Sequence, residues 1–165
     1  MDMELAKKTY KDPALSFRFF VPSLPYGIPA QFVKSVTCPF YNIGSVDHNI
    51  ASMSWFFPST RDIADLEITF NEDSAYQTTS GVEVWRKEIC DDDLNYGLPV
   101  TYLKDINIFV LDVAKPKILK VLQYSDVWPL GVPSHEYDVG ESTQLTTAVT
   151  FKCRRLRVIN VSGGH

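Results

Sequence analysis

The segment from Leu66 to Asn71 constrains the fold more than any other part of the chain, because its residues alternate strictly between apolar and polar. The alternating residues are Leu66, Glu67, Ile68, Thr69, Phe70 and Asn71. Strict alternation is typical of a β-strand with one buried face and one face in contact with water. The segment therefore predicts such a strand.

A helix is predicted directly after this strand, from about Ala75 to Cys90. Its apolar residues recur at helical intervals, namely Val82, Trp85 and Ile89. Asp73 and Ser74 offer an N-cap, and Gln77 stands three residues after Ser74, in the spacing of a capping box. Gly81 weakens the helix by about 1 kcal/mol relative to Ala.

Most other regular segments favour β structure, and aromatic residues reach 13% of the chain. The predicted strands are Leu15–Val21, Gln31–Phe40, Ile106–Val113, Ile118–Tyr124 and one long strand, Thr143–Val158. The segment from Ser125 to Ser142 is interpreted as irregular. A chain of 165 residues is one domain of ordinary size. We therefore predict a mainly β fold, an antiparallel β-sandwich or small barrel with one packed helix, as a single domain over residues 1–165.

Residues 41–65 are harder to assign and are interpreted as a long hairpin or loop. They contain three adjacent aromatic residues, Trp55, Phe56 and Phe57. Adjacent residues of a strand point to opposite faces, so at least one of the three should face something other than the core of this domain. A partner surface is one interpretation, and a strand lying between two apolar layers is the other.

The sequence offers little catalytic chemistry, so we expect a non-enzymatic protein without cofactor or metal. Three cysteines stand far apart without a Cys-x-x-Cys pair, and we expect them to be reduced core residues: Cys38, Cys90 and Cys153. The histidines have no partners at metal-ligand spacing: His48, His135 and His165. The sequence contains no phosphate-binding glycine motif and no nucleophile elbow.

Two charged clusters stand out. The basic one is on the last predicted strand and comprises Lys152, Arg154, Arg155 and Arg157. The acidic one, residues 91–93, is three successive aspartates that should end the helix, because acids oppose the helix dipole at its C-terminus. The basic cluster lacks the interleaved aromatic residues of a nucleic-acid stacking platform. We favour pairing between the two clusters across a contact between subunits.

The net charge of −4 argues against sequence-independent binding to duplex DNA. The first 16 residues carry six charged side chains and have no apolar core of a secretory signal. The longest uncharged stretch, Phe19–Val33, is broken by three prolines and is too short to span a bilayer, so no membrane partner is expected.

Several local patterns, taken in order, resemble the tail tube proteins of tailed bacteriophages, a family whose fold is shared with the type VI secretion tube. Phe17–Val21 followed by Leu24–Pro29 resembles the first strand and the Leu-Pro-x-Gly-Ile connection of contractile-tail tube proteins. Leu66–Asp73 resembles the strand that precedes the single helix of the family. Trp128-Pro129 and the closing strand Leu145–Val158 resemble the last part of the family fold.

This resemblance implies a structural subunit that forms hexameric rings, with sheets that join around a lumen and rings that stack into a tube conducting DNA at infection. It implies subunit contacts through an N-terminal arm, residues 1–14, and through residues 41–65. The expected interface residues are Trp55, Phe56, Arg154 and Arg155. A DNA lumen should not attract phosphate, and the expected lumen-facing acids are Glu67 and Asp112.

The implied partners are further copies of the chain and sheath, baseplate and tape-measure proteins, with DNA passing through without specific binding. The implied location is the virion tail, after synthesis in the host cytoplasm. Two alternatives share the fold: a baseplate tube-initiator protein and a type VI secretion tube protein. A third alternative, a monomeric β-sandwich binding module, predicts a stable monomer with a concave apolar pocket.

Overall fold

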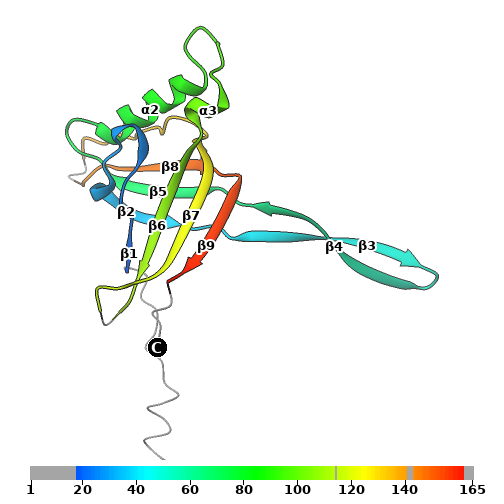
Figure 1. Cartoon of the computed structure of the whole chain (residues 1–165). Helices are drawn as coiled ribbons and strands as arrows, with labels where there is room; N and C mark the ends of the chain where they lie inside the picture. Colours follow the sequence, from blue (N-terminus) through cyan, green and yellow to red (C-terminus); the bar gives the residue numbers. More distant parts are fainter. Residues whose placement is uncertain (1–17, 114, 141–142, 162–165) are drawn as a thin grey trace, which may run out of the picture.

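The computed structural model describes residues 18–113, 115–140 and 143–161. Antiparallel strands form two layers that run across each other (Figure 1). The first layer has the order β1-β6-β7-β9, with β1 Phe19–Phe20, β6 Lys104–Leu111, β7 Ile118–Pro129 and β9 Arg155–Asn160. The second has the order β2-β5-β8, with β2 Val33–Thr37, β5 Leu66–Asn71 and β8 Thr146–Lys152. The end of β7 joins the layers, because Trp128 and Pro129 pair with β8. The mainly β, antiparallel prediction is confirmed.

The core lies between the two layers and under helix α2 (Gln77–Ile89). The apolar half of β5 is fully buried, as its alternation predicts, and it lies beside Val149 and Phe151 of β8. Trp85 of α2 closes the core: its ring centroid lies 5.6 Å from that of Phe151, and its Nε1–H donates to the Tyr102 carbonyl at 2.7 Å. Short helices flank it: η1 Pro25–Gly27, η2 Ala30–Phe32 and α3 Pro99–Tyr102.

The start of α2 differs from the prediction. Tyr76 is the N-cap residue and has a left-handed backbone, so the capping box from Ser74 to Gln77 is absent. Two acids bind the first amides instead: Asp73 Oδ1 accepts from Gln77 N–H at 3.0 Å, and buried Glu72 accepts from Thr78 N–H at 3.1 Å. Negative charge at a helix N-terminus is favourable because of the helix dipole.

Gly81 has a packing role that outweighs its weak helix propensity. A Cβ atom at this position would lie 2.6 Å from Ile28 Cγ1 and 3.0 Å from the Tyr26 carbonyl oxygen. The glycine therefore lets η1 and the segment after it lie directly against α2.

Two strand predictions are wrong near the C-terminal end. β7 continues through the first residues of the segment predicted to be irregular, with Asp126 in a left-handed conformation at φ 56°. The predicted single strand Thr143–Val158 is two strands, because the chain leaves β5 after Lys152 and joins β7 from Arg155 onward. In its first half, alternate residues are buried, namely Thr147, Val149, Phe151 and Cys153.

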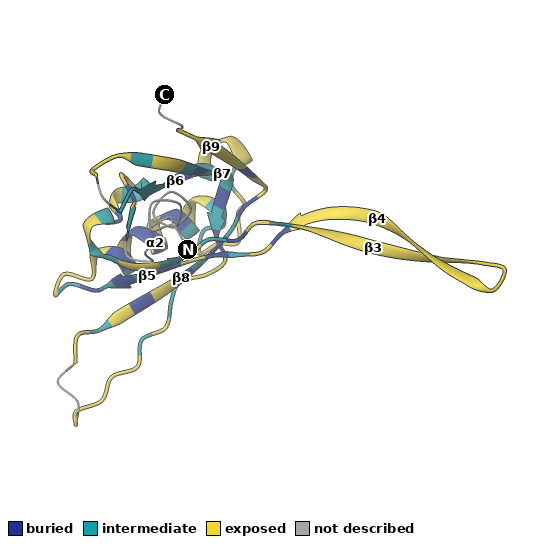
Figure 2. Ribbon diagram, turned by 90° about the horizontal axis from the view of Figure 1, so that it is seen from below, coloured by how far each residue is buried: buried dark blue, intermediate teal, exposed yellow. Residues whose placement is uncertain are grey.

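Residues 41–63 form a hairpin, β3 (Tyr41–Ile50) and β4 (Met53–Ile63), that projects from the body (Figures 1 and 2). Nearly all of its residues are exposed. The predicted N-terminal arm, the start of the first predicted strand and His165 lie outside the described residues. Among the described helices, none has the length and apolar character needed to cross a membrane.

Candidate subunit-interface surfaces

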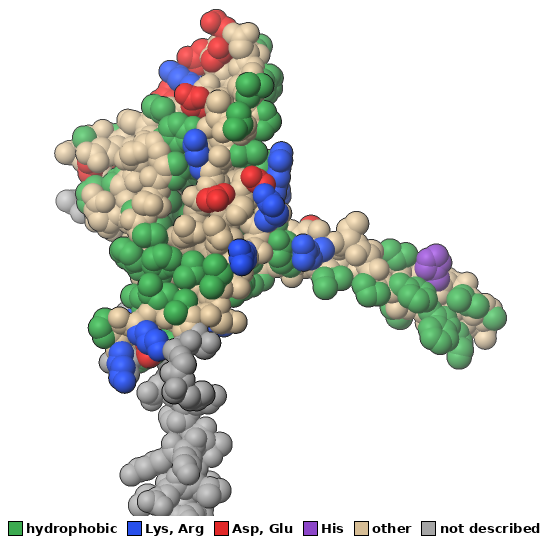
Figure 3. Space-filling model, in the orientation of Figure 1, with side chains coloured by type: hydrophobic (Ala, Val, Ile, Leu, Met, Phe, Trp, Pro, Cys, Tyr) green, Lys and Arg blue, Asp and Glu red, His purple; other side chains and the backbone are tan. Residues whose placement is uncertain are grey.

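One face of the hairpin is an apolar stripe. Directly opposed residues of an antiparallel pair share a face, and so do residues two apart on one strand. The register pairs Val46 with Phe57, His48 with Trp55 and Ile50 with Met53. These six residues, here named the hairpin stripe, therefore lie on one side, and all are exposed. Figure 3 shows apolar side chains gathered along the hairpin.

The predicted interface residues Trp55 and Phe56 lie on opposite faces of this hairpin. Trp55 belongs to the hairpin stripe, whereas Phe56 is opposed to Asp47 and is 73% exposed. Phe57 is exposed too, and its ring meets that of His48 edge-on at 5.9 Å between centroids. The interpretation of these aromatic residues as part of a strand between two apolar layers of its own chain is therefore wrong.

The outward side of the second layer is a polar face. The register aligns Thr37, Glu67 and Thr150 in one row and Ser35, Thr69 and Ala148 in the next; these six residues are here named the polar face. Their neighbours along β5 and β8 point into the core. The predicted lumen residue Glu67 thus lies at the centre of a surface of small, mostly hydroxyl-bearing side chains.

Asp112 lies elsewhere. β6 ends at Leu111, so Asp112 follows the strand and belongs to the turn before β7, where its N–H donates to the Lys117 carbonyl at 2.8 Å. The expectation that it stands on a strand face is wrong, because the β6–β7 turn begins earlier than the sequence pattern indicates.

The second layer has two open edges. β2 has β5 as its strand partner, and the described chain places no strand on its other side. The opposite edge is formed by β8. Its Thr150 carbonyl points away from β5, since it accepts a hydrogen bond from Leu130 N–H at 2.9 Å. The main-chain groups of Ala148 and Thr146 point the same way by the alternation of the strand, and β7 pairs with β8 only through Trp128 and Pro129.

The basic residues of the last strand have partners within the chain. Lys152 Nζ lies 2.8 Å from Asp65 Oδ1, and the Arg155 guanidinium lies 2.9 Å from Asp126 Oδ2. The hydrogen bond to Asp65, followed by its charge, raises the pKa of Lys152. The Arg154 guanidinium lies 5.6 Å from the centroid of the Trp128 ring. A contact of Arg154 and Arg155 with another subunit stays a prediction.

The acidic triplet is largely bound within its own loop. Asp91 accepts hydrogen bonds from Asn95, and Asp92 pairs with Arg86 at 2.9 Å and with Lys87 at 3.5 Å. Asp93 is thus the main member of the triplet that could pair with the basic strand of another subunit. This pairing stays a prediction.

Sequence reasoning missed a buried polar network at the start of α2. Glu72 Oε2 accepts hydrogen bonds from the hydroxyls of Thr147, at 2.7 Å, and Thr79, at 3.0 Å. Thr79 Oγ1 also lies 2.8 Å from His135 Nε2. The Thr79 hydroxyl donates its proton to Glu72, so the proton in the bond between Thr79 and His135 is carried by His135 Nε2. In the sequence, the only indication of this network was the acidic Glu72 between the alternating strand and the helix.

The three cysteines form no disulfide in the structure, and their reduced state stays a prediction. Cys153 is buried, and Cys38 and Cys90 are partly buried. Burial raises the pKa of the Cys38 and Cys153 thiols, which disfavours their reactive thiolates. Among the described residues, no three His, Cys, Asp or Glu side chains gather as a set that would hold a metal ion.

Comparison with known proteins gives a likeness of fold. No protein-family profile and no curated protein matches the sequence. Among the solved structures that match over nearly their whole length are the following three. The anti-feeding prophage cap, described as its tube terminating cap, is 16% identical, with a TM-score of 0.73 over 93% of this chain and 95% of the other. A chain in the 6-fold symmetrised structure of the anti-feeding prophage baseplate is 14% identical, with a TM-score of 0.65 over 92% of this chain and 99% of the other.

The third match is the sheath–tube complex, in its extended state, of the extracellular contractile injection system PVC. The matching chain of that complex is 15% identical, with a TM-score of 0.69 over 98% of this chain and 99% of the other. The structural neighbours are thus parts of contractile injection systems, and the chain has the tail tube-like fold.

Proposed function

We propose that this chain is a non-enzymatic structural subunit of a phage tail tube or of the tube of a related contractile injection system, in which rings of copies stack around a lumen. The hairpin stripe carries this proposal. Six exposed side chains, including Trp55, Phe57 and Met53, lie on an arm that projects from the body and finds no partner in the described chain. An apolar surface of this kind marks a protein–protein contact.

The open edges of the second layer supply a way to close a ring. An exposed strand edge is a template for pairing with another chain, and a ring of copies removes it. In the proposed ring, β2 of one copy pairs with the free half of β8 of the next. The polar face then continues from copy to copy. The baseplate structure of the anti-feeding prophage is 6-fold symmetrised, which supports a hexamer.

In this arrangement the polar face lines the lumen. Its hydroxyl groups and the Glu67 carboxylate offer water-compatible, neutral or negative surface, which does not hold a polyanion such as DNA. This surface therefore supports DNA as the cargo that passes through the lumen. Asp112 lies in the β6–β7 turn, away from the polar face, and is not assigned to the lumen.

The proposed partners are further copies of the chain, a sheath protein and a baseplate. The descriptions of the structural neighbours, a sheath–tube complex, a baseplate and a cap, support these partners and a location in the assembled tail. A tape-measure partner stays a prediction from the sequence resemblance.

A protein at one end of the tube is the second candidate. The similarity to the structure of a tube terminating cap favours it. A subunit of the shaft forms stacks of many rings, whereas an end protein forms single rings and needs a second protein to continue the tube.

Cysteine cross-linking tests the proposed ring. Ser35 of β2 and Ala148 or Thr146 of β8 are exposed on the two open edges. We expect the pair Ser35→Cys with Ala148→Cys, or Ser35→Cys with Thr146→Cys, to give an oxidation ladder that ends at six covalently joined subunits. Each single variant is the control for the native cysteines. Rings without a ladder would show that other edges join. A protein that forms neither rings nor a ladder, even with a tail preparation that supplies a tube end, would contradict the proposed function.

A further inference from the structure

The connection between α2 and α3 presents exposed apolar side chains at one end of the molecule. Leu94, Tyr96, Leu98 and Val100 are 77%, 81%, 68% and 81% exposed. They alternate along residues 94–100, and Figure 1 shows this connection at the end of the body beyond α2. The name acidic–apolar loop is used here for residues 91–100.

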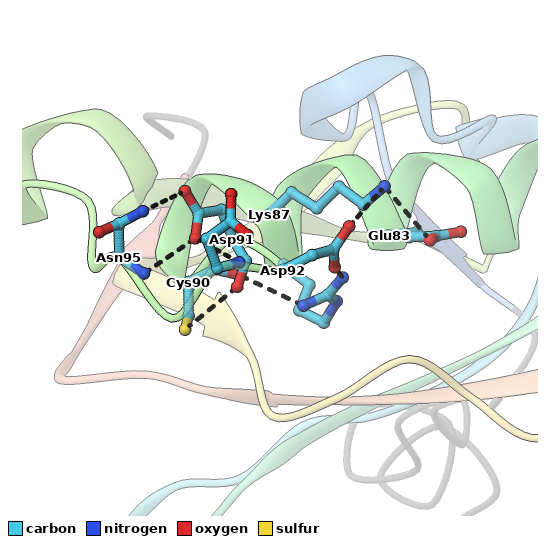
Figure 4. Close-up of polar contacts among 8 residues, drawn as sticks. Glu83, Lys87, Cys90, Asp91, Asp92 and Asn95 are labelled. Atoms are coloured by element: carbon cyan, nitrogen blue, oxygen red, sulfur yellow. Dashed lines mark hydrogen bonds and ion pairs between the residues drawn. The ribbon is translucent and has the colours of Figure 1, made fainter.

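Hydrogen bonds hold this loop in one conformation. The Asp91 carboxylate accepts from the main-chain N–H groups of Asp93 and Asn95, at 2.9 and 2.8 Å, and from the Asn95 amide at 3.0 Å (Figure 4). Gly97 N–H donates to the Ile89 carbonyl at 2.9 Å, and a Cβ atom at Gly97 would collide with the Glu88 carbonyl oxygen. Apolar side chains on a loop that is already ordered lose little entropy when a partner binds.

The charge around the loop is negative. Glu88 and Asp93 are exposed, and neither is part of an ion pair among the described residues. Arg86 and Lys87 are nearby, but both pair with Asp92. In Figure 3, acidic side chains gather at this end of the molecule.

The opposite end of the molecule has the complementary character. The β6–β7 turn and the start of β7 carry three exposed lysines, Lys115, Lys117 and Lys120. Exposed apolar residues lie beside them on β1, β7 and the end of β9: Phe20, Leu119, Ile159 and Val161. The two turn lysines, Lys115 and Lys117, and these four apolar residues are here named the basic end, whereas Lys120 lies on the other face of β7 by the register. Figures 1 and 3 show the basic end on the far side of the body from the acidic–apolar loop.

We infer that the acidic–apolar loop of one copy docks on the basic end of the next copy in the ring. This inference rests on the proposed function. Two different surfaces of one chain that fit each other make a head-to-tail contact, and such contacts close into a ring when the rotation between copies allows it. Opposite charge at the two surfaces favours the second copy as the occupant and sets the direction of the contact.

The open edges agree with this direction. In Figure 1, β8 lies nearer to α2 and β2 lies farther from it. Pairing of a β8 edge with the β2 edge of the next copy therefore brings the loop side of one copy toward the basic-end side of its neighbour. The acidic–apolar loop thus forms a second contact across the same subunit boundary.

A charge exchange tests this contact. The double variant Glu88→Lys with Asp93→Lys reverses the loop, and Lys115→Glu with Lys117→Glu reverses the basic end. We expect each double variant to raise the protein concentration needed for ring formation by about tenfold or more at low salt, and the combined four-residue variant to restore most of the loss. Glu136→Lys, an exposed acid on the β7–β8 connection, is the control for charge alone.

Replacing Leu94 and Tyr96 by Ser tests the apolar part, with ring formation followed by sedimentation and the monomer checked by thermal unfolding. Unchanged ring formation in the reversed variants overturns the inference and leaves the proposed function standing. Loss without restoration in the combined variant also overturns it, because the two surfaces then do not pair with each other. Failure of the wild-type chain to form rings, both alone and with a tail preparation that supplies a tube end, contradicts the proposed function itself.

Discussion

The Tyr41 hydroxyl lies 2.8 Å from the main-chain nitrogen of Leu156, which is 115 residues away, and accepts its hydrogen bond. Tyr41 begins the hairpin and Leu156 lies on β9, so the bond joins the base of the arm to the first layer. The Arg61 guanidinium lies 4.1 Å from the centroid of the Tyr41 ring. The Tyr124 hydroxyl donates to the Pro39 carbonyl at 2.9 Å. These contacts set the direction in which the hairpin leaves the body.

Tyr41→Phe should weaken assembly and lower stability. It leaves the Leu156 N–H without its acceptor, which costs about 1 kcal/mol in the free energy of unfolding. We expect a lower denaturant midpoint and a higher concentration for ring formation. Tyr102→Phe is the control, because Tyr102 contributes its carbonyl, which accepts from Trp85. Equal behaviour of Tyr41→Phe and the wild type in both assays would show that the bond does not orient the hairpin.

Trp55→Ser should affect assembly without affecting the monomer. Trp55 is 53% exposed and belongs to the hairpin stripe, so its loss removes little apolar contact within its own chain. We expect the concentration for ring or tube formation to rise at least about tenfold, equivalent to about 1.4 kcal/mol. Phe56→Ser, on the opposite face, should have a smaller effect. Sedimentation and thermal unfolding measure the two quantities, and a large loss of thermal stability with normal assembly would contradict this role.

Gly81→Ala should destabilise the fold although Ala is the better helix former. The added methyl group meets Ile28 and the Tyr26 carbonyl, and overpacking of this kind costs about 1–3 kcal/mol. Ser80→Ala, at an exposed position of the same helix, is the matched control and should be neutral or slightly stabilising. Urea unfolding compares them. A gain in stability for Gly81→Ala would show that η1 does not need this close approach.

Asn95→Ala should raise the pKa of Asp91 toward its ordinary value. The side-chain hydrogen bond from Asn95, followed by the main-chain bonds from Asn95 and Asp93, lowers that pKa in the folded protein. A carboxyl group with a lowered folded pKa stabilises the fold above its unfolded pKa, about 3.9, and this contribution is lost as the pH falls through the folded value. A carbon-13 NMR titration of Asp91 measures the shift. An unchanged midpoint in the variant would assign the effect to the main chain.

The parts of the fold that follow local rules were predictable. Leu66, Ile68 and Phe70 are buried because period-two alternation reports directly on a half-buried strand. The break between β8 and β9 was not predictable, since residues 143–158 are β-prone throughout and only pairing with β5 and then β7 divides them. The helix start was missed because Glu72 and Asp73 bind its amides, in place of Ser74.

The surfaces proposed as interfaces were predictable only as segments. Three adjacent aromatic residues indicated a contact outside the core, but the separation of Trp55 from Phe56 follows from the register with β3. The hydroxyl-rich character around Glu67 needed three strands from distant parts of the sequence to be aligned. The acidic aspartates were visible in the sequence, whereas their partners Arg86, Lys87 and Asn95 depend on the fold of the loop.

Negative-stain electron microscopy of the purified full-length chain over a range of concentrations, with its mass measured in solution, tests the central claim most directly. The account predicts rings with a central hole, at six times the mass of the chain, and stacks of such rings at high concentration. A monomer at every concentration, which still forms no rings when mixed with a tail preparation that supplies a tube end, would contradict it.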